Sequence, residues 1–267
     1  MTTKTVVPVS TPWPGPLEHE LVPYRPWSDW SDRTILVLAP HPDDEVLGCG
    51  GLLAQSHRMG WRSHVVVVSD GGLGGDPATR EAESRAAADV LISDFHSGKA
   101  DQGSRHSMEF WRLPDRSLLP GEVLRQRIMD AVAATAAQWV IAPSPFEVHP
   151  DHRAVCRASI EATAALQSKG CEADLIFCEI GQPQIANMLV DISAVAATKT
   201  LAVKCFKSQL DQQPYHDQVA GLNRQRSYTL GPSVMYAEAY WRVAPEELAD
   251  GVDGVLGGIF RQLKRRL

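Results

Sequence analysis

Short, almost continuously apolar runs alternate with stretches of helix-forming residues along most of this chain. Two of these runs, TILVLAP from Thr34 and HVVVV from His64, are typical of strands buried on both faces of a sheet. Each is followed by a predicted helix, and the second of these helices has Asp76 as its N-cap and Pro77 at its first position. The alternation indicates βαβ units. The sequence therefore predicts a three-layer α/β/α, Rossmann-like fold around a mainly parallel sheet.

The same pattern extends through the rest of the chain. Further strands are expected at residues 107–115, 139–144, 173–181, 187–193 and 236–241, and further helices at 48–60, 121–138, 153–168, 194–210 and 214–226. No repeat, low-complexity segment or break in composition divides this region. We therefore expect one domain over residues 32–267, preceded by an arm rich in proline and tryptophan over residues 1–31 that lies extended across it.

Composition narrows the possible classes of protein. The 267 residues carry a formal net charge of -6, so no overall basic field attracts nucleic acid. The five cysteines are widely spaced and form no C-x-x-C pair, which favours reduced thiols and a cytoplasmic location. We expect neither a signal peptide nor a transmembrane segment, because no run of about 18 apolar residues occurs. Composition gives no indication of the oligomeric state.

Two motifs of histidine and acidic residues follow predicted strands. HPDDE, from His41 to Glu45, comes directly after the first strand. HPDH, from His149 to His152, comes shortly after the strand that begins at Trp139. Ligands of open α/β sheets gather beyond the carboxyl ends of the strands. We therefore expect these two motifs, although far apart in sequence, to meet at one edge of the sheet.

The first motif favours a divalent metal, because adjacent carboxylates repel one another unless a cation offsets their charge. A catalytic zinc site has three protein ligands and an open position for water, and ferrous iron accepts the same nitrogen and oxygen ligands. The candidate residues are His41, Asp43, Asp44, His149 and His152. Their spacing does not decide which three bind the ion. It indicates a division into metal ligands, a carboxylate that accepts a proton from water, and a histidine that supports developing negative charge.

Together, APHPDDE and HPDH resemble the motifs of the PIG-L and LmbE-like family of zinc-dependent N-acetylglucosaminyl de-N-acetylases. Either motif alone is weak, whereas both in this order are specific. The resemblance extends from about Thr34 to the stretch YAEAYW, which ends at Trp241. It implies a de-N-acetylase-like catalytic domain that binds zinc and removes the N-acetyl group of an N-acetylglucosamine-type sugar or glycoconjugate. The products would be acetate and a free amine.

The resemblance also implies roles for the residues of the two motifs. His41, Asp44 and His152 correspond to the metal ligands. Asp43 corresponds to the general base, and His149 to the group that stabilises the tetrahedral oxyanion and protonates the departing amine. The native metal stays open between zinc and ferrous iron.

Further residues acquire expected roles from the same resemblance. Asp151 corresponds to an acid of the catalytic group that holds the far nitrogen of a histidine, and Arg80 and Asp115 correspond to groups that contact the substrate. Arg116 stands where relatives have glycine after LPD, which leaves the local turn open. Glu147 occupies a position at which relatives differ, so the choice of substrate can diverge there.

Several alternatives stay open at this stage. One is hydrolysis of a different N-acyl amide, and another is an inactive relative that keeps the metal and binds a glycan. The stretch GCGGLL from Gly48 is compatible with a dinucleotide-binding loop, but a glycine is missing, and tight turning and close helix packing explain it better. Asp151 is also compatible with a simple helix N-cap. The basic stretch IFRQLKRRL, at residues 259–267, favours a surface helix over a membrane anchor.

Overall fold

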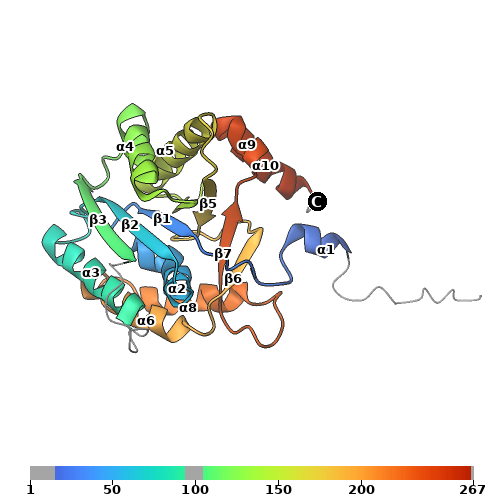
Figure 1. The fold of residues 1–267 in the computed structure, drawn as a ribbon. Coiled ribbons are helices and arrows are strands. Elements are labelled where there is room, and N and C mark those ends of the chain that lie inside the picture. Colours follow the sequence, from blue (N-terminus) through green and yellow to red (C-terminus); the bar gives the residue numbers. More distant parts are fainter. Residues whose placement is uncertain (1–15, 94–104, 266–267) are drawn as a thin grey trace, which may run out of the picture.

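A computed structural model describes residues 16–93 and 105–265 and shows an α/β fold (Figure 1). One seven-stranded sheet runs through the molecule. Its strands are β1 (Thr34–Ala39), β2 (Arg62–Ser69), β3 (His106–Leu113), β4 (Trp139–Pro143), β5 (Asp174–Cys178), β6 (Met188–Asp191) and β7 (Ala237–Arg242). Their order across the sheet is β3-β2-β1-β4-β5-β7-β6.

Helices cover both faces of the sheet. They are α1 (Pro16–Leu21), α2 (Asp44–Arg58), α3 (Pro77–Ser93), α4 (Glu122–Thr135), α5 (Pro150–Gln167), α6 (Ala196–Val203), α7 (Lys207–Leu210), α8 (Tyr215–Arg226), α9 (Pro245–Ala249) and α10 (Gly251–Lys264). In Figure 1, α4, α5, α9 and α10 lie on one face, and α2, α3, α6 and α8 lie on the other. The predicted three-layer α/β/α arrangement is confirmed.

The strands from β1 to β5 are parallel, whereas β7 is antiparallel to both of its neighbours, β5 and β6. β1 and β4 are adjacent and in register, with Val37 opposite Ile141. The loops that follow these two strands therefore leave the sheet side by side at its carboxyl edge. This adjacency positions the two motifs that the sequence singles out.

Side chains of β1 explain why its sequence is continuously apolar. Leu36 and Leu38 pack into the core beneath α4 and α5, whereas Ile35 and Val37 pack into the core on the α2 side. All four are buried. Burying an aliphatic side chain of this size contributes about 1.5–3 kcal/mol, so a strand covered on both faces has no position at which a polar residue is favoured.

The glycines of GCGGLL lie inside α2 and not in a turn, so the expected tight turning is wrong and close helix packing is confirmed. A Cβ atom on Gly51 would lie 2.5 Å from Cγ2 of Ile192 and 2.8 Å from Oε1 of Glu238. The backbone of α2 can approach these neighbours only because no side chain intervenes. A dinucleotide fingerprint requires its glycines in the turn between strand and helix, which is not where they lie.

Glu238 of β7 forms the centre of a buried polar network behind α2. Its carboxylate accepts hydrogen bonds of 2.7 Å each from the backbone N–H groups of Gly51 and Leu52, the ammonium group of Lys199 and the hydroxyl of Tyr240. Glu238 and Tyr240 therefore fix the last strand to the helix layer, and the charge of the buried lysine is paired.

The described part of the N-terminal arm covers the amino ends of the strands. Trp27 packs edge-on against Trp139 at a ring separation of 5.6 Å, and Trp30 packs against Trp61 at 5.5 Å. The N–H of Trp27 donates to the carbonyl oxygen of Leu189 at 2.7 Å. The prediction of an extended arm is wrong at Pro16–Leu21, which form α1, and residues 1–15 lie outside the described residues.

The predicted C-terminal helix is the second half of α10. Val255 and Ile259 bury one face of this helix in the core, while Phe260 and Leu263 are exposed beside basic side chains. Among the residues that the structure describes, no helix is both long and apolar enough to cross a bilayer.

Candidate active site

The two motifs meet at the carboxyl edge of the sheet. His41 lies in the turn between β1 and α2, and His152 lies in the first turn of α5, which follows β4. Although 111 positions separate them, Nδ1 of His41 lies 3.2 Å from Nε2 of His152. The expectation that two distant loops converge is therefore fulfilled by the adjacency of β1 and β4.

Asp44 completes a tight triangle of donor atoms with these two histidines. Its Oδ2 lies 3.2 Å from Nδ1 of His41 and 3.1 Å from Nε2 of His152. Donor atoms about 2.0–2.1 Å from a tetrahedral zinc ion lie about 3.3 Å from one another. All three side chains are buried, and their nitrogen and oxygen donors suit zinc or ferrous iron. The residues present therefore fit a divalent metal.

Charges in this cluster favour a cation at its centre. Burial opposes protonation of His41, but its contacts with Asp151 and Asp44 raise its pKa to about 9. Burial opposes protonation of His152 as well, and the Asp44 carboxylate raises that pKa to about 10. Burial also disfavours the charged form of Asp44, but His152 and His41 hold its pKa well below its usual range.

Two overlapping groups around His41 also bring potential ligand atoms within 4.8 Å of one another. One consists of His41, His149 and His152, and the other of His41, Asp115 and Asp151. In the triangle with Asp44 all three donor separations are 3.1–3.2 Å, close to the spacing expected around a tetrahedral zinc ion.

The three consecutive acids each have a different partner, which explains how they coexist. Asp44 faces the two histidines, and Asp43 faces Arg80, whose guanidinium lies 3.0 Å from the Asp43 carboxylate. Glu45 turns back along the chain, and its carboxylate accepts the backbone N–H of Asp43 at 3.0 Å. Glu45 also lies in the first turn of α2, where the helix dipole favours negative charge.

Asp43 has an unusual backbone and an unusual carboxylate. Its φ of 126° is rare for a residue other than glycine, and such strain is often found at functional sites. Burial and the neighbouring charge of Asp44 raise the pKa of Asp43 to about 8, and Arg80 acts in the opposite direction. A buried carboxyl group with this proton affinity suits proton transfer near neutral pH.

His149 caps α5 and presents one ring nitrogen for other contacts. Its Nδ1 accepts the backbone N–H of Asp151 at 3.2 Å, and its ring lies 4.6 Å from that of His41. Burial and the charges of His41 and His152 lower its pKa, which favours the neutral ring. Because Nδ1 accepts a hydrogen bond, the neutral ring carries its proton on Nε2 and can donate it.

Asp151 and Asp115 hold the far nitrogen of His41. An Oδ atom of each lies 3.2 Å from Nε2 of His41. Asp151 is fully buried and also accepts the backbone N–H groups of Arg116 and Leu118 at 2.7 and 3.2 Å. His149 supplies the side-chain cap of α5, so the alternative in which Asp151 acts only as N-cap is wrong.

The turn that the sequence left open contains Arg116 in the conformation typical of glycine. Its φ of 56° lies in the left-handed region, which is where a glycine is expected. The arginine adopts this conformation despite a cost of about 1–2 kcal/mol. Its N–H donates to the buried carboxylate of Asp151, a charge-assisted hydrogen bond that offsets part of this cost.

Arg80 lies beside the cluster and is itself buried. Its guanidinium donates to the carbonyl oxygens of Gly71 and Pro42 and to the Asp43 carboxylate. These contacts use much of its hydrogen-bonding capacity within the protein. Contact of Arg80 with a substrate, expected from sequence, stays a prediction.

Glu147 has a role that the sequence did not reveal. Its Oε2 lies 3.2 Å from Nδ1 of His152, on the side of the ring opposite to the donor triangle. Its remaining contacts are with backbone groups of residues 180–182, which no spacing rule connects to position 147. The only sequence signal was an acid close to the HPDH motif.

A cavity of about 660 Å³ opens over the cluster. Its floor contains the two histidines and Asp44 of the triangle together with Asp43 and His149. One wall is apolar and is formed by Leu47, Ile180, Pro183, Tyr215, Val219 and Leu222. Charged, polar and apolar side chains that converge on one cavity are typical of a small-molecule site.

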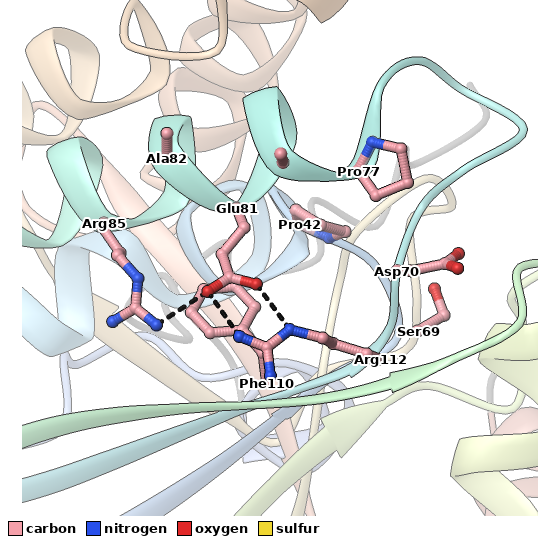
Figure 2. Close-up of a pocket in the computed structure, with 10 residues that line it drawn as sticks. Pro42, Ser69, Asp70, Pro77, Glu81, Ala82, Arg85, Phe110 and Arg112 are labelled. Carbon is pink, nitrogen blue, oxygen red and sulfur yellow. Dashed lines mark hydrogen bonds and ion pairs between the residues drawn. The ribbon is translucent and has the colours of Figure 1, made fainter.

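A second cavity of about 530 Å³ lies beneath α3 (Figure 2). Its main charged groups are paired with one another, because Glu81 binds Arg85 at 2.8 Å and Arg112 at 2.9 Å. The Arg85 guanidinium also lies over the ring of Phe110. No histidine is among the residues that line this cavity, so the first cavity is the candidate active site.

Fold and site together define a class: an α/β protein with a buried histidine and carboxylate cluster at the carboxyl ends of two adjacent parallel strands. Residues 36–163 match the model of the PIG-L family, described as GlcNAc-PI de-N-acetylase. The matched region is just under half of the chain and contains both motifs. The resemblance seen in the sequence is confirmed.

Individual relatives agree with this assignment. The chain is 24% identical over 196 residues to a diacetylchitobiose deacetylase from Thermococcus kodakarensis, covering 67% of this chain and 71% of the relative. Among solved structures, the conserved protein TT1542 from Thermus thermophilus matches with a TM-score of 0.67 and 28% identity, over 80% of this chain and 95% of its own.

Two further structures share the fold at lower identity. The N,N'-diacetylchitobiose deacetylase from Pyrococcus horikoshii has a TM-score of 0.64 and 21% identity, over 80% of this chain and 84% of its own. A 4-carboxy-2-hydroxymuconate hydratase from Pseudomonas putida has a TM-score of 0.65 and 23% identity, over 80% of this chain and 97% of its own. The fold alone therefore accommodates more than one reaction, and the function must be argued from the site.

Proposed function

We propose that this protein is a metal-dependent hydrolase that removes the N-acetyl group from an N-acetylglucosamine-type sugar or glycoconjugate. The observation that carries the proposal is the buried triangle of His41, Asp44 and His152 with Asp43 directly beside it. The family match and the deacetylase relatives support the same reaction.

His41, Asp44 and His152 would hold the metal, with zinc the first candidate and ferrous iron the second. When bound, such an ion polarises a carbonyl oxygen and lowers the pKa of a water molecule. Asp151 and Asp115 keep the far nitrogen of His41 occupied, so that Nδ1 of this ring faces the triangle.

Asp43 is the proposed proton acceptor for the attacking water. Its raised pKa gives it the proton affinity that this step needs, and Arg80 fixes the orientation of the carboxylate. After attack on the acetyl carbon, the same carboxyl group can return the proton to the departing amine, a role that the resemblance implied for His149. The acetyl C–N bond then breaks to give acetate and the free amino sugar.

His149 is the proposed donor to the oxyanion. Its Nδ1 is occupied by the N–H of Asp151, so the proton on Nε2 is available to an oxygen that becomes negative during attack. The ring borders the cavity and packs against His41, which keeps it close to the reacting carbonyl.

The cavity supports a substrate of amino-sugar size. Its volume of about 660 Å³ accommodates a sugar with an attached group. We propose that Asp115 accepts a sugar hydroxyl, because the lone pairs of a carboxylate exceed the two contacts that Asp115 makes with His41 and the N–H of Leu73. Arg80 is the proposed second contact at this end of the cavity.

The test measures acetate release from a panel of N-acetylglucosaminides. Protein stripped with a chelator should be inactive, and activity should return with Zn²⁺ or Fe²⁺ and not with Mg²⁺. Activity that persists in metal-free protein, or metal-loaded protein that releases no acetate from any member of the panel, would contradict the proposal.

The apolar wall of the cavity favours one alternative, an amidase that removes a longer N-acyl group. Leu47, Val219 and Leu222 would contact such a chain. Substrates with acetyl, butyryl and octanoyl groups on the same amino sugar distinguish the two possibilities through their relative kcat/KM values.

A further inference from the structure

Glu147 lies directly behind His152. It belongs to the turn between β4 and α5, and only 3% of its surface is exposed. Its Oε2 lies 3.2 Å from Nδ1 of His152, whose other nitrogen forms one corner of the donor triangle. The side chain therefore contacts a proposed metal ligand from the side opposite to the metal.

The same carboxylate gathers the loop that follows β5. Its Oε1 accepts the backbone N–H groups of Ile180, Gly181 and Gln182 at 3.0, 3.1 and 3.2 Å. A Cβ atom on Gly181 would lie 3.2 Å from Oε2, so the loop approaches the carboxylate closely. Ile180 and Gly181 both line the cavity over the site.

This loop is also connected to α8, which contributes other residues to the cavity wall. Glu179, at the start of the loop, accepts the N–H of Gln184 at 2.7 Å and forms an ion pair with Arg226 at the end of α8. The first turns of α8 supply Tyr215 and Val219 to the wall. Contacts from the ligand His152 to the cavity wall are therefore continuous through Glu147 and this loop.

The chemistry of the contact with His152 is directional. A neutral imidazole donates through one nitrogen and binds a metal through the lone pair of the other. Glu147 as a carboxylate can only accept, so it favours the proton of His152 on Nδ1 and leaves the lone pair of Nε2 toward Asp44. The three backbone N–H groups need acceptors as well, and the carboxylate serves all four donors.

We propose that Glu147 is a positioning residue that fixes the tautomer and ring orientation of His152 for metal binding and joins this ligand to the cavity wall at residues 180–182. This inference rests on the metal centre of the proposed function. Groups that hold a metal-bound histidine from behind typically contribute a factor of about 10–100 to metal affinity.

Glutamine at position 147 cannot replace the carboxylate. If its amide oxygen accepts the N–H groups of the loop, its NH₂ group faces Nδ1 of His152 and moves the ring proton to Nε2, where it blocks the metal. If the amide turns over, its NH₂ group faces the three backbone donors instead. In either orientation the NH₂ group of the glutamine faces another hydrogen-bond donor, and that contact is lost.

The experiment compares Glu147→Gln with the matched control Glu179→Gln. Glu179 is equally buried, with 5% exposed, and holds the same loop, but its carboxylate contacts Gln184 and Arg226 in place of a proposed metal ligand. Zn²⁺ affinity of the purified, metal-stripped proteins is measured by competition with a chromophoric chelator. We expect Glu147→Gln to weaken affinity about 10–100-fold and Glu179→Gln to change it less than about threefold. An affinity of Glu147→Gln within about threefold of the parent, or an equal loss in both variants, would overturn the proposal.

A measurement on the parent protein covers the case in which Glu147→Gln does not fold. In ¹⁵N-labelled, Zn²⁺-loaded protein, the ring N–H of His152 is assigned by its absence from His152→Asn. We expect the proton on Nδ1, whereas a proton on Nε2 would refute the positioning role. Neither readout involves turnover, so the positioning role can survive if the protein proves not to be a deacetylase.

Discussion

The Arg80 guanidinium lies 3.0 Å from the carboxylate of Asp43, and both side chains are buried. The two residues are 37 positions apart and meet because α3 passes beside the turn that follows β1. The contact lowers the pKa of Asp43 and so offsets part of the rise that burial and Asp44 cause. We therefore expect Arg80 to influence proton transfer through Asp43 as well as any contact with the substrate.

Replacing Arg80 should change the pH dependence of the reaction. In Arg80→Met the Asp43 carboxyl group loses the positive charge of its arginine partner, so its pKa rises. The base must be deprotonated to act, so we expect kcat/KM at pH 7 to fall at least about tenfold and to recover partly toward pH 9. Arg85→Met, on the same helix but paired with Glu81, should leave the profile unchanged. A uniform loss at every pH would show that Arg80 acts on binding and not on Asp43.

Removing the proposed base should separate catalysis from metal binding. Asp43→Asn keeps the shape of the side chain and tolerates the positive φ of 126°. We expect turnover to fall by a factor of about 10²–10⁴, while Zn²⁺ affinity changes only a few-fold. Both quantities are measured on the same preparation. Turnover near that of the parent would exclude Asp43 as the base.

Metal affinity should depend steeply on pH. In the metal-free protein the pKa values of His41 and His152 are raised to about 9 and about 10, so both rings carry protons at neutral pH. A protonated ring has no lone pair for a metal, and each displaced proton makes affinity rise up to about tenfold per pH unit below the pKa. We expect at least about a tenfold rise in Zn²⁺ affinity per unit between pH 6 and 8. Proton release on metal addition, followed with an indicator dye, provides the check, and an affinity independent of pH would contradict it.

The buried pair of Lys199 and Glu238 yields a prediction about stability. Lys199→Met removes the only cation in contact with the Glu238 carboxylate among the described residues, which should lower the free energy of unfolding by about 3 kcal/mol. Urea unfolding measures this change. The double variant Lys199→Met/Glu238→Gln should recover part of the loss, because a neutral amide needs no cation. No recovery would indicate that the aliphatic part of Lys199, and not its charge, is important.

Much of the site could be predicted from sequence because its residues fall in two short motifs. The continuous apolar runs before His41 and after Gln138 identify strands buried on both faces, and parallel strands place their following loops at one edge. The spacing of residues within the two motifs did not indicate which of them bind the metal. The choice of Asp44 over Asp43 came from the family resemblance. In the structure the two carboxylates face different partners, since Asp44 contacts His152 and Asp43 contacts Arg80.

The remaining contacts depend on tertiary packing that no local pattern encodes. The antiparallel direction of β7 follows from its long-range pairing with β5 and β6. An apolar run predicts a strand but does not indicate the direction in which that strand crosses the sheet. Glu147 and the N–H groups of residues 180–182 lie 33–35 positions apart, and only the completed sheet brings them together. The glycines of α2 were misjudged in part for the same reason: their neighbour Glu238 is 187 positions from Gly51.

The tryptophan pairs at the amino ends of the strands have a practical consequence. Trp27, Trp30, Trp61 and Trp139 account for four of the seven indoles of the chain, and the donor triangle lies beyond the opposite ends of the same strands. Light emitted by these indoles should thus respond to the loss of the arm and the sheet and not to occupancy of the reaction centre. Fluorescence from these four indoles is therefore an optical probe of unfolding that should change little when an ion or a substrate binds.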